Sequence, residues 1–260
     1  TADLMFRMCT NLKKVVFPAF SNNAVSATYM FAGCSALTTV TIPSPIVLST
    51  IKNMFAQCTS LTSINLSNVS GVTDADSAFY NCTSLTSVNI STLTAVTNAE
   101  SMFGECRVLA SINVSALTAV TNAKNMFKNC VKLTSINMAP FTNVVNAEGM
   151  FDSCSSLRTV SNFSMPNVTN AYKMFCACSS LTGAFNASSM TEVTNAGWMF
   201  QGDYYLTSIN VSGMTKLEIT DRMFSGCERL TTINQPTFSG VQNAEYMFAN
   251  CRVLTGLDIS

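Results

Sequence analysis

The sequence repeats itself with a period of about 24 residues, and this period limits the possible folds more than any other feature. A phenylalanine returns every 24 residues, with two steps of 25. These ruler phenylalanines are Phe6, Phe31, Phe55, Phe79, Phe103, Phe127, Phe151, Phe175, Phe200, Phe224 and Phe248. A unit this short cannot bury its own apolar residues, so each copy must be completed by its neighbour. We therefore expect one elongated solenoid of about eleven repeats over residues 1–260.

Each repeat contains a predicted strand. A leucine follows every ruler phenylalanine by six residues and opens segments such as "LTSINLS" at residues 61–67. Apolar and polar residues alternate over the second half of this segment, and its apolar residues are often β-branched, which is typical of a strand. Stacked copies would form a parallel sheet with strands about 4.8 Å apart.

The segment before each ruler phenylalanine predicts a short helix. In "NAESMF", Asn98 is a suitable N-cap, and Ala99, Met102 and Phe103 have helical spacing. The predicted fold class is therefore a curved α/β repeat solenoid. Its parallel β-sheet would line the concave face, and short helical or 3₁₀ turns would cover the convex face.

The repeated M-F-x-x-C-x-x-L pattern, followed by L-x-x-I-x-L, resembles the BspA-type leucine-rich repeats, which are related to the treponemal class. The resemblance extends along the whole chain and implies a leucine-rich-repeat horseshoe. It also implies an exposed or secreted protein, of bacterial type, that adheres to host or neighbouring-cell components. The family supplies no catalytic residues. No capping unit is recognisable at either end, so we expect the chain to be a fragment of a longer protein, anchored through segments not present here.

Composition argues against several classes of function. The 14 basic and 14 acidic residues cancel, so the positive excess expected of a nucleic-acid-binding protein is missing. Histidine, the commonest general base and metal ligand, is absent. No apolar run reaches the roughly 18 residues that cross a bilayer. We predict a non-enzymatic protein without cofactor or metal, without a nucleic-acid partner and without a membrane span in this segment.

Ten of the eleven cysteines form a column three residues after the ruler phenylalanines. They are Cys9, Cys34, Cys58, Cys82, Cys106, Cys130, Cys154, Cys178, Cys227 and Cys251. Neighbouring thiols are close enough for disulfides, but their side chains would point the same way, and a zinc site needs ligands around one point. Buried, reduced thiols are the favoured interpretation, with disulfides as the alternative. Cys176 stands outside the column, at a position that is polar in adjacent repeats, and is expected to point outward.

The polar face of the predicted sheet is nearly uniform. Its outward positions carry small polar residues, and the asparagines among them are Asn65, Asn89, Asn113, Asn137, Asn210 and Asn234. Two interpretations remain open. The stacked amides could hydrogen-bond along the sheet and stabilise it, or they could bind a repetitive ligand such as a glycan. Charged residues at equivalent positions of adjacent repeats, such as Lys124 with Glu148 and Lys128 with Asp152, are expected to pair.

One repeat departs from the pattern. In "NAGWMFQGDYYL", Asp203 replaces the column cysteine, close to Trp198, Tyr204 and Tyr205. Aromatic residues beside a carboxylate are typical of a sugar-stacking or protein-binding patch, although bulky side chains could also fill space left by the missing thiol. These four residues are the candidate ligand-binding site.

The sequence is compatible with two functions. The first is a cell-surface or secreted binding module for a host or neighbouring-cell surface protein or glycan. The second is a structural spacer or assembly element of a stalk, fibre or phage-borne appendage, with possible end-to-end self-association. Variation concentrated in one patch would favour binding, whereas evenly spread variation would favour the spacer.

Overall fold

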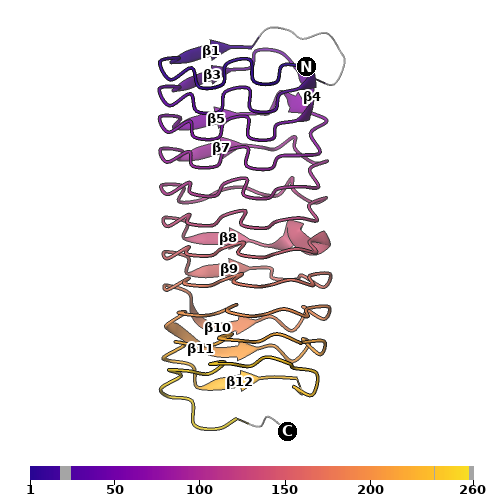
Figure 1. Ribbon diagram of the computed structural model, residues 1–260, viewed down its shortest axis with the longest axis vertical. Coiled ribbons are helices and arrows are strands. Elements are labelled where there is room, and N and C mark those ends of the chain that lie inside the picture. Colours follow the sequence, from indigo (N-terminus) through magenta and orange to yellow (C-terminus); the bar gives the residue numbers. More distant parts are fainter. Residues whose placement is uncertain (18–24, 237, 258–260) are drawn as a thin grey trace.

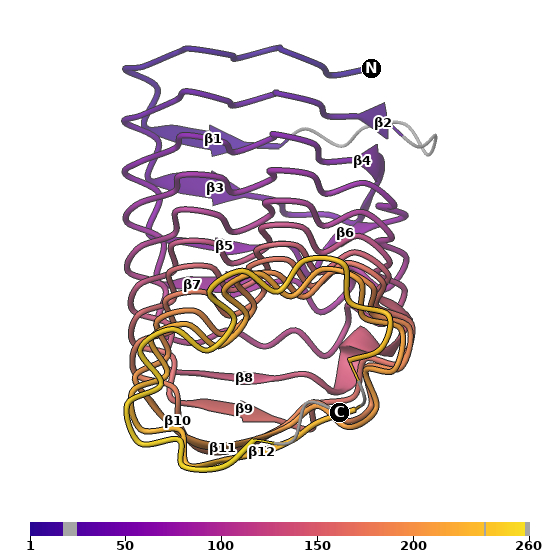
Figure 2. The same cartoon turned by 60° about the horizontal axis from the view of Figure 1, so that its bottom comes forward.

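The structure is a computed structural model that describes residues 1–17, 25–236 and 238–257, and it is a parallel β-solenoid of stacked coils (Figure 1). Each sequence repeat makes one coil, and the coils follow one another from the N-terminus to the C-terminus of the stack. Figure 2 shows that the coils change their tilt gradually along the stack. The predicted solenoid is therefore confirmed.

The predicted strands lie side by side along one face, which we call the strand face. They are β1 (Lys14–Val16), β3 (Thr39–Thr41), β5 (Ser63–Asn65), β7 (Ser87–Asn89), β8 (Ser135–Asn137), β9 (Thr159–Ser161), β10 (Thr182–Asn186), β11 (Tyr205–Asn210) and β12 (Thr232–Asn234). Their pairings are parallel, with equivalent residues of adjacent repeats opposite each other, as in Ser63 with Ser87. The coil between β7 and β8 passes this face without regular strand structure.

A second row of parallel contacts runs along a corner of the coils. It begins with β2 (Val25–Ser26), β4 (Ile46–Thr50) and β6 (Val69–Ser70). It continues as one bridge per coil, and we call these residues the corner ladder: Thr50, Asp74, Asn98, Asn122, Asn146, Asn170, Asn195, Ile219 and Asn243.

The helical turns predicted before the ruler phenylalanines are not formed. These segments are tight turns on what we call the turn face. Within the described ranges the single helix is the 3₁₀ helix η1 (Ala139–Asn143), which lies elsewhere in its coil. No helix in those ranges is long and apolar enough to cross a bilayer. The α/β assignment was wrong in this respect, although Ala99, Met102 and Phe103 are all buried as their spacing predicted.

Hydrogen bonding explains why turns replace helices. The amide N–H groups of Ala99, Ser101, Phe103 and Glu105 each donate to a carbonyl of the next coil, at 2.8–2.9 Å. The alternate N–H groups donate within their own coil to the residue three positions back, as Met102 does to Ala99. A helix about 10 Å wide does not fit between coils stacked about 5 Å apart, whereas flat turns do.

The core consists of columns of identical side chains. The eleven ruler rings form one continuous stack, with centroids 5.3–6.0 Å apart and planes within 10° of parallel. The rings from Phe31 to Phe224 have no exposed surface. Columns of Leu, Met and Cys complete the interior. This continuous core carries the stability of the stack, because each coil covers the apolar surface of the next.

Candidate binding surfaces

The turn face carries one left-handed residue two positions before each ruler phenylalanine, with φ between 51° and 60°. We call this column position −2. It contains Leu4, Tyr29, Asn53, Ser77, Ser101, Asn125, Gly149, Lys173, Trp198, Arg222 and Tyr246. A left-handed backbone favours glycine or asparagine, so bulky residues there are unusual and worth explaining. Such residues occupy four consecutive coils at the C-terminal end of the column.

Those four residues form a cation–aromatic column. The Lys173 ammonium lies 4.8 Å from the Trp198 ring centroid, and the Arg222 guanidinium lies 4.7 Å from the same ring. Arg222 also lies 4.7 Å from the ring of Tyr246, which is 61% exposed. The Trp198 indole N–H donates to the Asp221 carboxylate at 2.7 Å. Cation–π contacts of this kind contribute about 0.5–1 kcal/mol each at exposed sites and hold the side chains in fixed positions.

Asp203 does not belong to any surface patch. Its side chain is fully buried in the cysteine column, so its prediction as a ligand contact is wrong. Neither carboxylate oxygen has a hydrogen-bond partner in the described residues. Burial raises the pKa of the Asp203 carboxyl well above its ordinary value. Burial therefore favours the neutral form of this acid, which occupies the space of a thiol.

Tyr204 and Tyr205 lie beyond Asp203 and remain at the surface. They are 45% and 44% exposed. The Arg229 guanidinium lies 4.6 Å from the Tyr205 ring centroid, which makes a second cation–aromatic pair. Trp198 contacts different partners, so the four predicted residues separate into three environments rather than one patch.

The column cysteines are free thiols, and they are buried everywhere except at the two ends of the stack, as predicted. Each thiol from Cys34 onward donates its S–H to the carbonyl of the ruler phenylalanine one coil earlier, as Cys130 does to Phe103 at 3.1 Å. Burial raises the pKa of Cys130 well above its ordinary value, which leaves it unreactive.

The prediction for Cys176 was wrong. Its side chain is only 6% exposed, and its thiol donates to the Gln201 amide oxygen at 3.3 Å. Burial raises the pKa of Cys176 to about 12. The neighbouring coil covers the thiol, which sequence position alone did not indicate.

The strand-face asparagines do not form the continuous amide ladder that one interpretation proposed, although the Asn162 amide donates to the Asn137 side-chain oxygen one coil away at 3.0 Å. The side-chain oxygens of Asn65, Asn89, Asn113, Asn137 and Asn210 each accept the backbone N–H two residues on, at 3.0–3.1 Å. They close turns at the ends of the strands. Asn210 and Asn234 also line a shallow hollow of about 350 Å³ over β10, β11 and β12. Whether this face binds a ligand stays a prediction.

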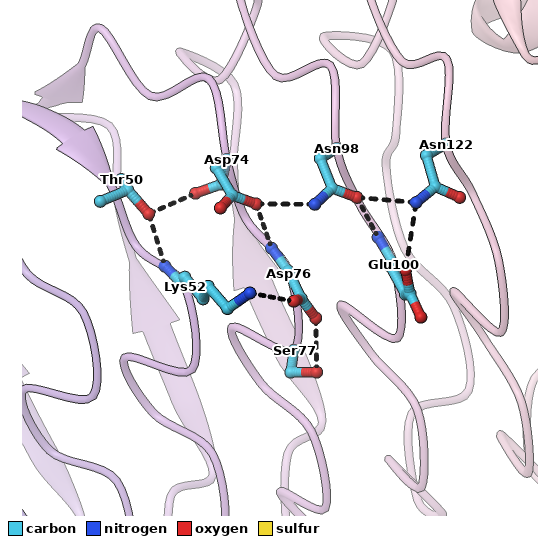
Figure 3. A network of polar contacts seen from close by, with 8 residues as sticks. All are labelled: Thr50, Lys52, Asp74, Asp76, Ser77, Asn98, Glu100 and Asn122. Carbon is cyan, nitrogen blue, oxygen red and sulfur yellow. Dashed lines mark hydrogen bonds and ion pairs between the residues drawn. The ribbon is translucent and has the colours of Figure 1, made fainter.

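The amide network predicted for the strand face occurs instead at the corner ladder (Figure 3). Asn122 donates to the Asn98 side-chain oxygen at 3.0 Å, and Asn98 donates to Asp74 at 2.9 Å. Asn98 also accepts the backbone N–H of Glu100, so it caps a turn where we expected it to cap a helix. The Lys52–Asp76 ion pair, at 2.8 Å, runs alongside. These bonds join coils and are structural.

The described residues contain no group of three His, Cys, Asp or Glu side chains that could hold a metal ion. The polar clusters are spread along the axis rather than converging on one point. Such an arrangement is suited to binding an extended or broad partner.

Sequence reasoning found Trp198 but missed Lys173, Arg222 and Tyr246. A signal for them was present, because aligning the repeats places all four at the same position. The shared position was overlooked because a helix was expected there, and in a helix position −2 would have an ordinary right-handed backbone.

Two family models match the sequence. One is described as "BspA type Leucine rich repeat region (6 copies)" and matches residues 2–99 and 75–199, which together span more than half of the chain. The other is described as "Mycoplasma protein of unknown function, DUF285" and matches residues 145–257. No curated protein matches significantly.

Several solved bacterial structures are similar. A leucine-rich repeat protein from Bacteroides ovatus is 20% identical, with a TM-score of 0.44, over 96% of this chain and 79% of that one. A leucine rich cell surface protein from Faecalibacterium prausnitzii is 19% identical, with a TM-score of 0.42, over 98% and 66%. A leucine-rich repeat protein from Eubacterium ventriosum is 16% identical, with a TM-score of 0.45, over 98% and 63%. This chain therefore spans slightly less than two thirds of the last two.

Proposed function

The chain belongs to the family of BspA-type leucine-rich repeat proteins, and we propose that it is a non-enzymatic binding module, displayed at a cell surface or secreted, that recognises a protein partner. The cation–aromatic column of Lys173, Trp198, Arg222 and Tyr246 carries this proposal. Tyr, Trp and Arg are the residues that most often dominate protein interfaces. Position −2 is small and polar from Asn53 to Gly149 and is bulky again only at Leu4 and Tyr29 near the N-terminus. The run of four large cationic and aromatic residues is the patch-like variation that distinguishes a binder from a spacer.

The column is well prepared for binding. Each side chain is held between its neighbours, so little rotamer freedom remains to be lost on association. The two cations are half-buried against aromatic rings, and the edges of the rings and of Tyr204 and Tyr205 remain exposed. A partner surface that presents carboxylates beside apolar side chains would complement it.

The proposal can be tested on an array of purified extracellular matrix proteins. A Trp198→Gly/Arg222→Gly variant removes two side chains where the backbone is left-handed, so glycine fits without strain. Saturable binding to the wild type should weaken by about tenfold or more in the variant, which corresponds to about 1.4 kcal/mol or more. A Ser153→Gly variant, at another left-handed position, is the matched control and should bind normally. Equal binding by both variants would contradict the proposal.

A structural spacer is the second candidate. The last described coil leaves an apolar hollow of about 520 Å³ lined by Phe238, Val241, Met247 and Phe248, among others. Under this alternative a second copy would stack there and extend the ring ladder. Sedimentation velocity distinguishes the two, because concentration-dependent end-to-end oligomers without binding to any matrix protein would favour the spacer.

A further inference from the structure

A polar groove crosses the N-terminal coils on the turn face. A hollow of about 440 Å³ extends from Arg7 and Tyr29 to Tyr80 and Ser101. A second hollow of about 210 Å³ continues from Tyr80 and Ser101 to Asn125 and Lys128. Because the two share Tyr80 and Ser101, they lie next to each other, and we call them together the groove. None of its lining residues belongs to the cation–aromatic column.

Small side chains create this groove. Apart from Tyr29 at one end, position −2 carries Asn53, Ser77 and Ser101 here, where the C-terminal coils carry larger side chains. Ala32, Ala56 and Gly104 are further small residues in its lining. A Cβ atom at Gly104 would approach the Tyr80 ring to 3.2 Å, so glycine there leaves room for the ring beside it.

Many hydrogen-bonding groups in the groove lack protein partners. Within the described residues no side-chain hydrogen bond is made by five lining residues, which are Asn53, Gln57, Tyr80, Ser101 and Asn125. Elsewhere on the molecule comparable amides are used, as in the corner ladder. Unpaired amides and hydroxyls in a concave site favour a ligand that both donates and accepts hydrogen bonds.

Two of the three charged residues that line the groove, Glu105 and Lys128, are paired with an opposite charge. Arg7 lies over the Tyr29 ring at 5.4 Å, Glu105 accepts from Arg107 at 2.9 Å, and Lys128 pairs with Asp152 at 3.0 Å. Arg7 keeps its charge, because a cation–π contact does not neutralise it, but the unpaired amides and hydroxyls outnumber this one charge, so the groove favours a ligand rich in hydroxyl groups.

The backbone of the groove also has little to offer a peptide. The N–H groups of Asn53, Gln57 and Ser77 donate to carbonyls of the next coil at 2.7–2.8 Å. A peptide that adds to a strand edge needs such groups free. Recognition must therefore come from side-chain amides, hydroxyls and aromatic rings.

We propose that this groove binds a neutral oligosaccharide lying along the solenoid axis. Tyr29 and Tyr80 would offer ring faces or edges to the apolar sides of sugar rings, and Asn53, Gln57, Ser101 and Asn125 would bind hydroxyl groups. The two tyrosines belong to coils two steps apart, which is about 10 Å along the axis and close to the length of a disaccharide. This site goes beyond the proposed protein-binding function and can fail or hold independently of it.

Isothermal titration calorimetry with short linear oligosaccharides of glucose, xylose, mannose and N-acetylglucosamine tests the proposal. The main variant is Asn53→Gly/Gln57→Gly, which removes two amides from left-handed positions and so leaves the coil unstrained. A Tyr80→Ala variant removes one ring. Ser153→Gly is the matched control outside the groove.

We expect at least one of these sugars to bind the wild type and the Ser153→Gly control equally. Both groove variants should raise the dissociation constant by about tenfold or more, with unchanged circular dichroism. The Trp198→Gly/Arg222→Gly variant should bind the sugar normally. The proposal is overturned if no neutral oligosaccharide binds the wild type, if the Asn53→Gly/Gln57→Gly variant binds as well as the wild type, or if an oligogalacturonate binds more tightly than every neutral sugar.

Discussion

The coil around Cys130 and the coil around Asp203 occupy equivalent places in the stack but differ in their interiors. The Cys130 thiol donates to the Phe103 carbonyl, whereas the Asp203 oxygens have no partner in the described residues. The ring steps on either side of Phe200 are 5.8 and 6.0 Å, compared with 5.6 and 5.4 Å on either side of Phe127. The ring stack is therefore more widely spaced at the irregular coil, where the Phe185 ring also packs edge-on against Phe200 at 5.3 Å.

This difference shows how much change the repeat tolerates. The hydrogen bond from the residue 203 N–H to the Phe200 carbonyl is kept at 3.2 Å, close to the 3.0 Å of its equivalent at Cys130. The inter-coil backbone bonds and the other columns hold the coil in place, so one polar residue is accepted inside the core. A neutral carboxyl is the form that such an interior accepts most readily.

The largest predicted effect comes from the ring stack. Phe127→Ala should lower the free energy of unfolding by about 3–5 kcal/mol, because it removes a fully buried ring from the tightly packed region. Phe200→Ala should cost less from its stacked contacts, which are longer, although it also loses the edge-on contact with Phe185. Urea denaturation of both variants checks the order, and equal losses would show that the looser spacing has no energetic consequence.

The next prediction concerns Asp203→Cys, which restores the column. The pKa of Asp203 is raised from 3.8 by burial, so the folded protein binds more protons than the unfolded chain above about pH 4. The stability of the wild type should therefore fall as pH rises from about 4 towards the folded pKa, by at most about 1.4 kcal/mol per pH unit.

The variant should be more stable than the wild type at pH 7, and the difference should shrink towards pH 4, where Asp203 is about half protonated in the unfolded chain. Thermal unfolding at pH 4, 5.5 and 7 measures this difference. An Asp203→Asn variant controls for the loss of the titrating group and should show the same flattened pH profile as Asp203→Cys. A constant difference across this range would mean that Asp203 is ionised in the folded protein.

A smaller difference is expected between the two sets of asparagines. Asn122→Ala removes both a turn cap and bonds to Asn98 and Glu100, and should cost about 1–2 kcal/mol. Asn113→Ala removes only a turn cap on the strand face and should cost about 0.5–1 kcal/mol. Chemical denaturation of the two variants gives the comparison, and a larger loss for Asn113 would contradict the structural role of the corner ladder.

The smallest effect should come from the surface ion pairs, which occur in both halves of the stack. Lys124 pairs with Glu148 at 3.1 Å, as its position predicted, and Lys216 pairs with Glu192 at 2.6 Å. Lys124→Ala and Lys216→Ala should each change stability by about 0–1 kcal/mol, and less in high salt because exposed charges are screened. A loss above this range would show that one pair fixes coil register.

The sequence alone determined the period, the columns and the buried side of each strand. Phe127, Leu133 and Cys130 recur at constant spacing, and a solenoid is the arrangement that buries all of them in continuous columns. It also indicated that residues 198–205 differ from the other repeats. These inferences hold because, in a stack of repeats, each residue packs mainly against the residue at the same position of the next repeat. The sequence alone identifies that residue once the repeats are aligned.

The tertiary structure was needed to determine the features that depend on the distance between coils. The turn before Phe103 has a pattern of buried residues that is compatible with a helix. It forms a flat turn instead, because carbonyls of the next coil accept hydrogen bonds from alternate N–H groups. The same closeness buried Cys176 and Asp203, placed the amide network at Asn98 and Asn122, and left a groove where position −2 is small. Local preference contributes tenths of a kcal/mol per residue, so the hydrogen bonds offered by a neighbouring coil outweigh it.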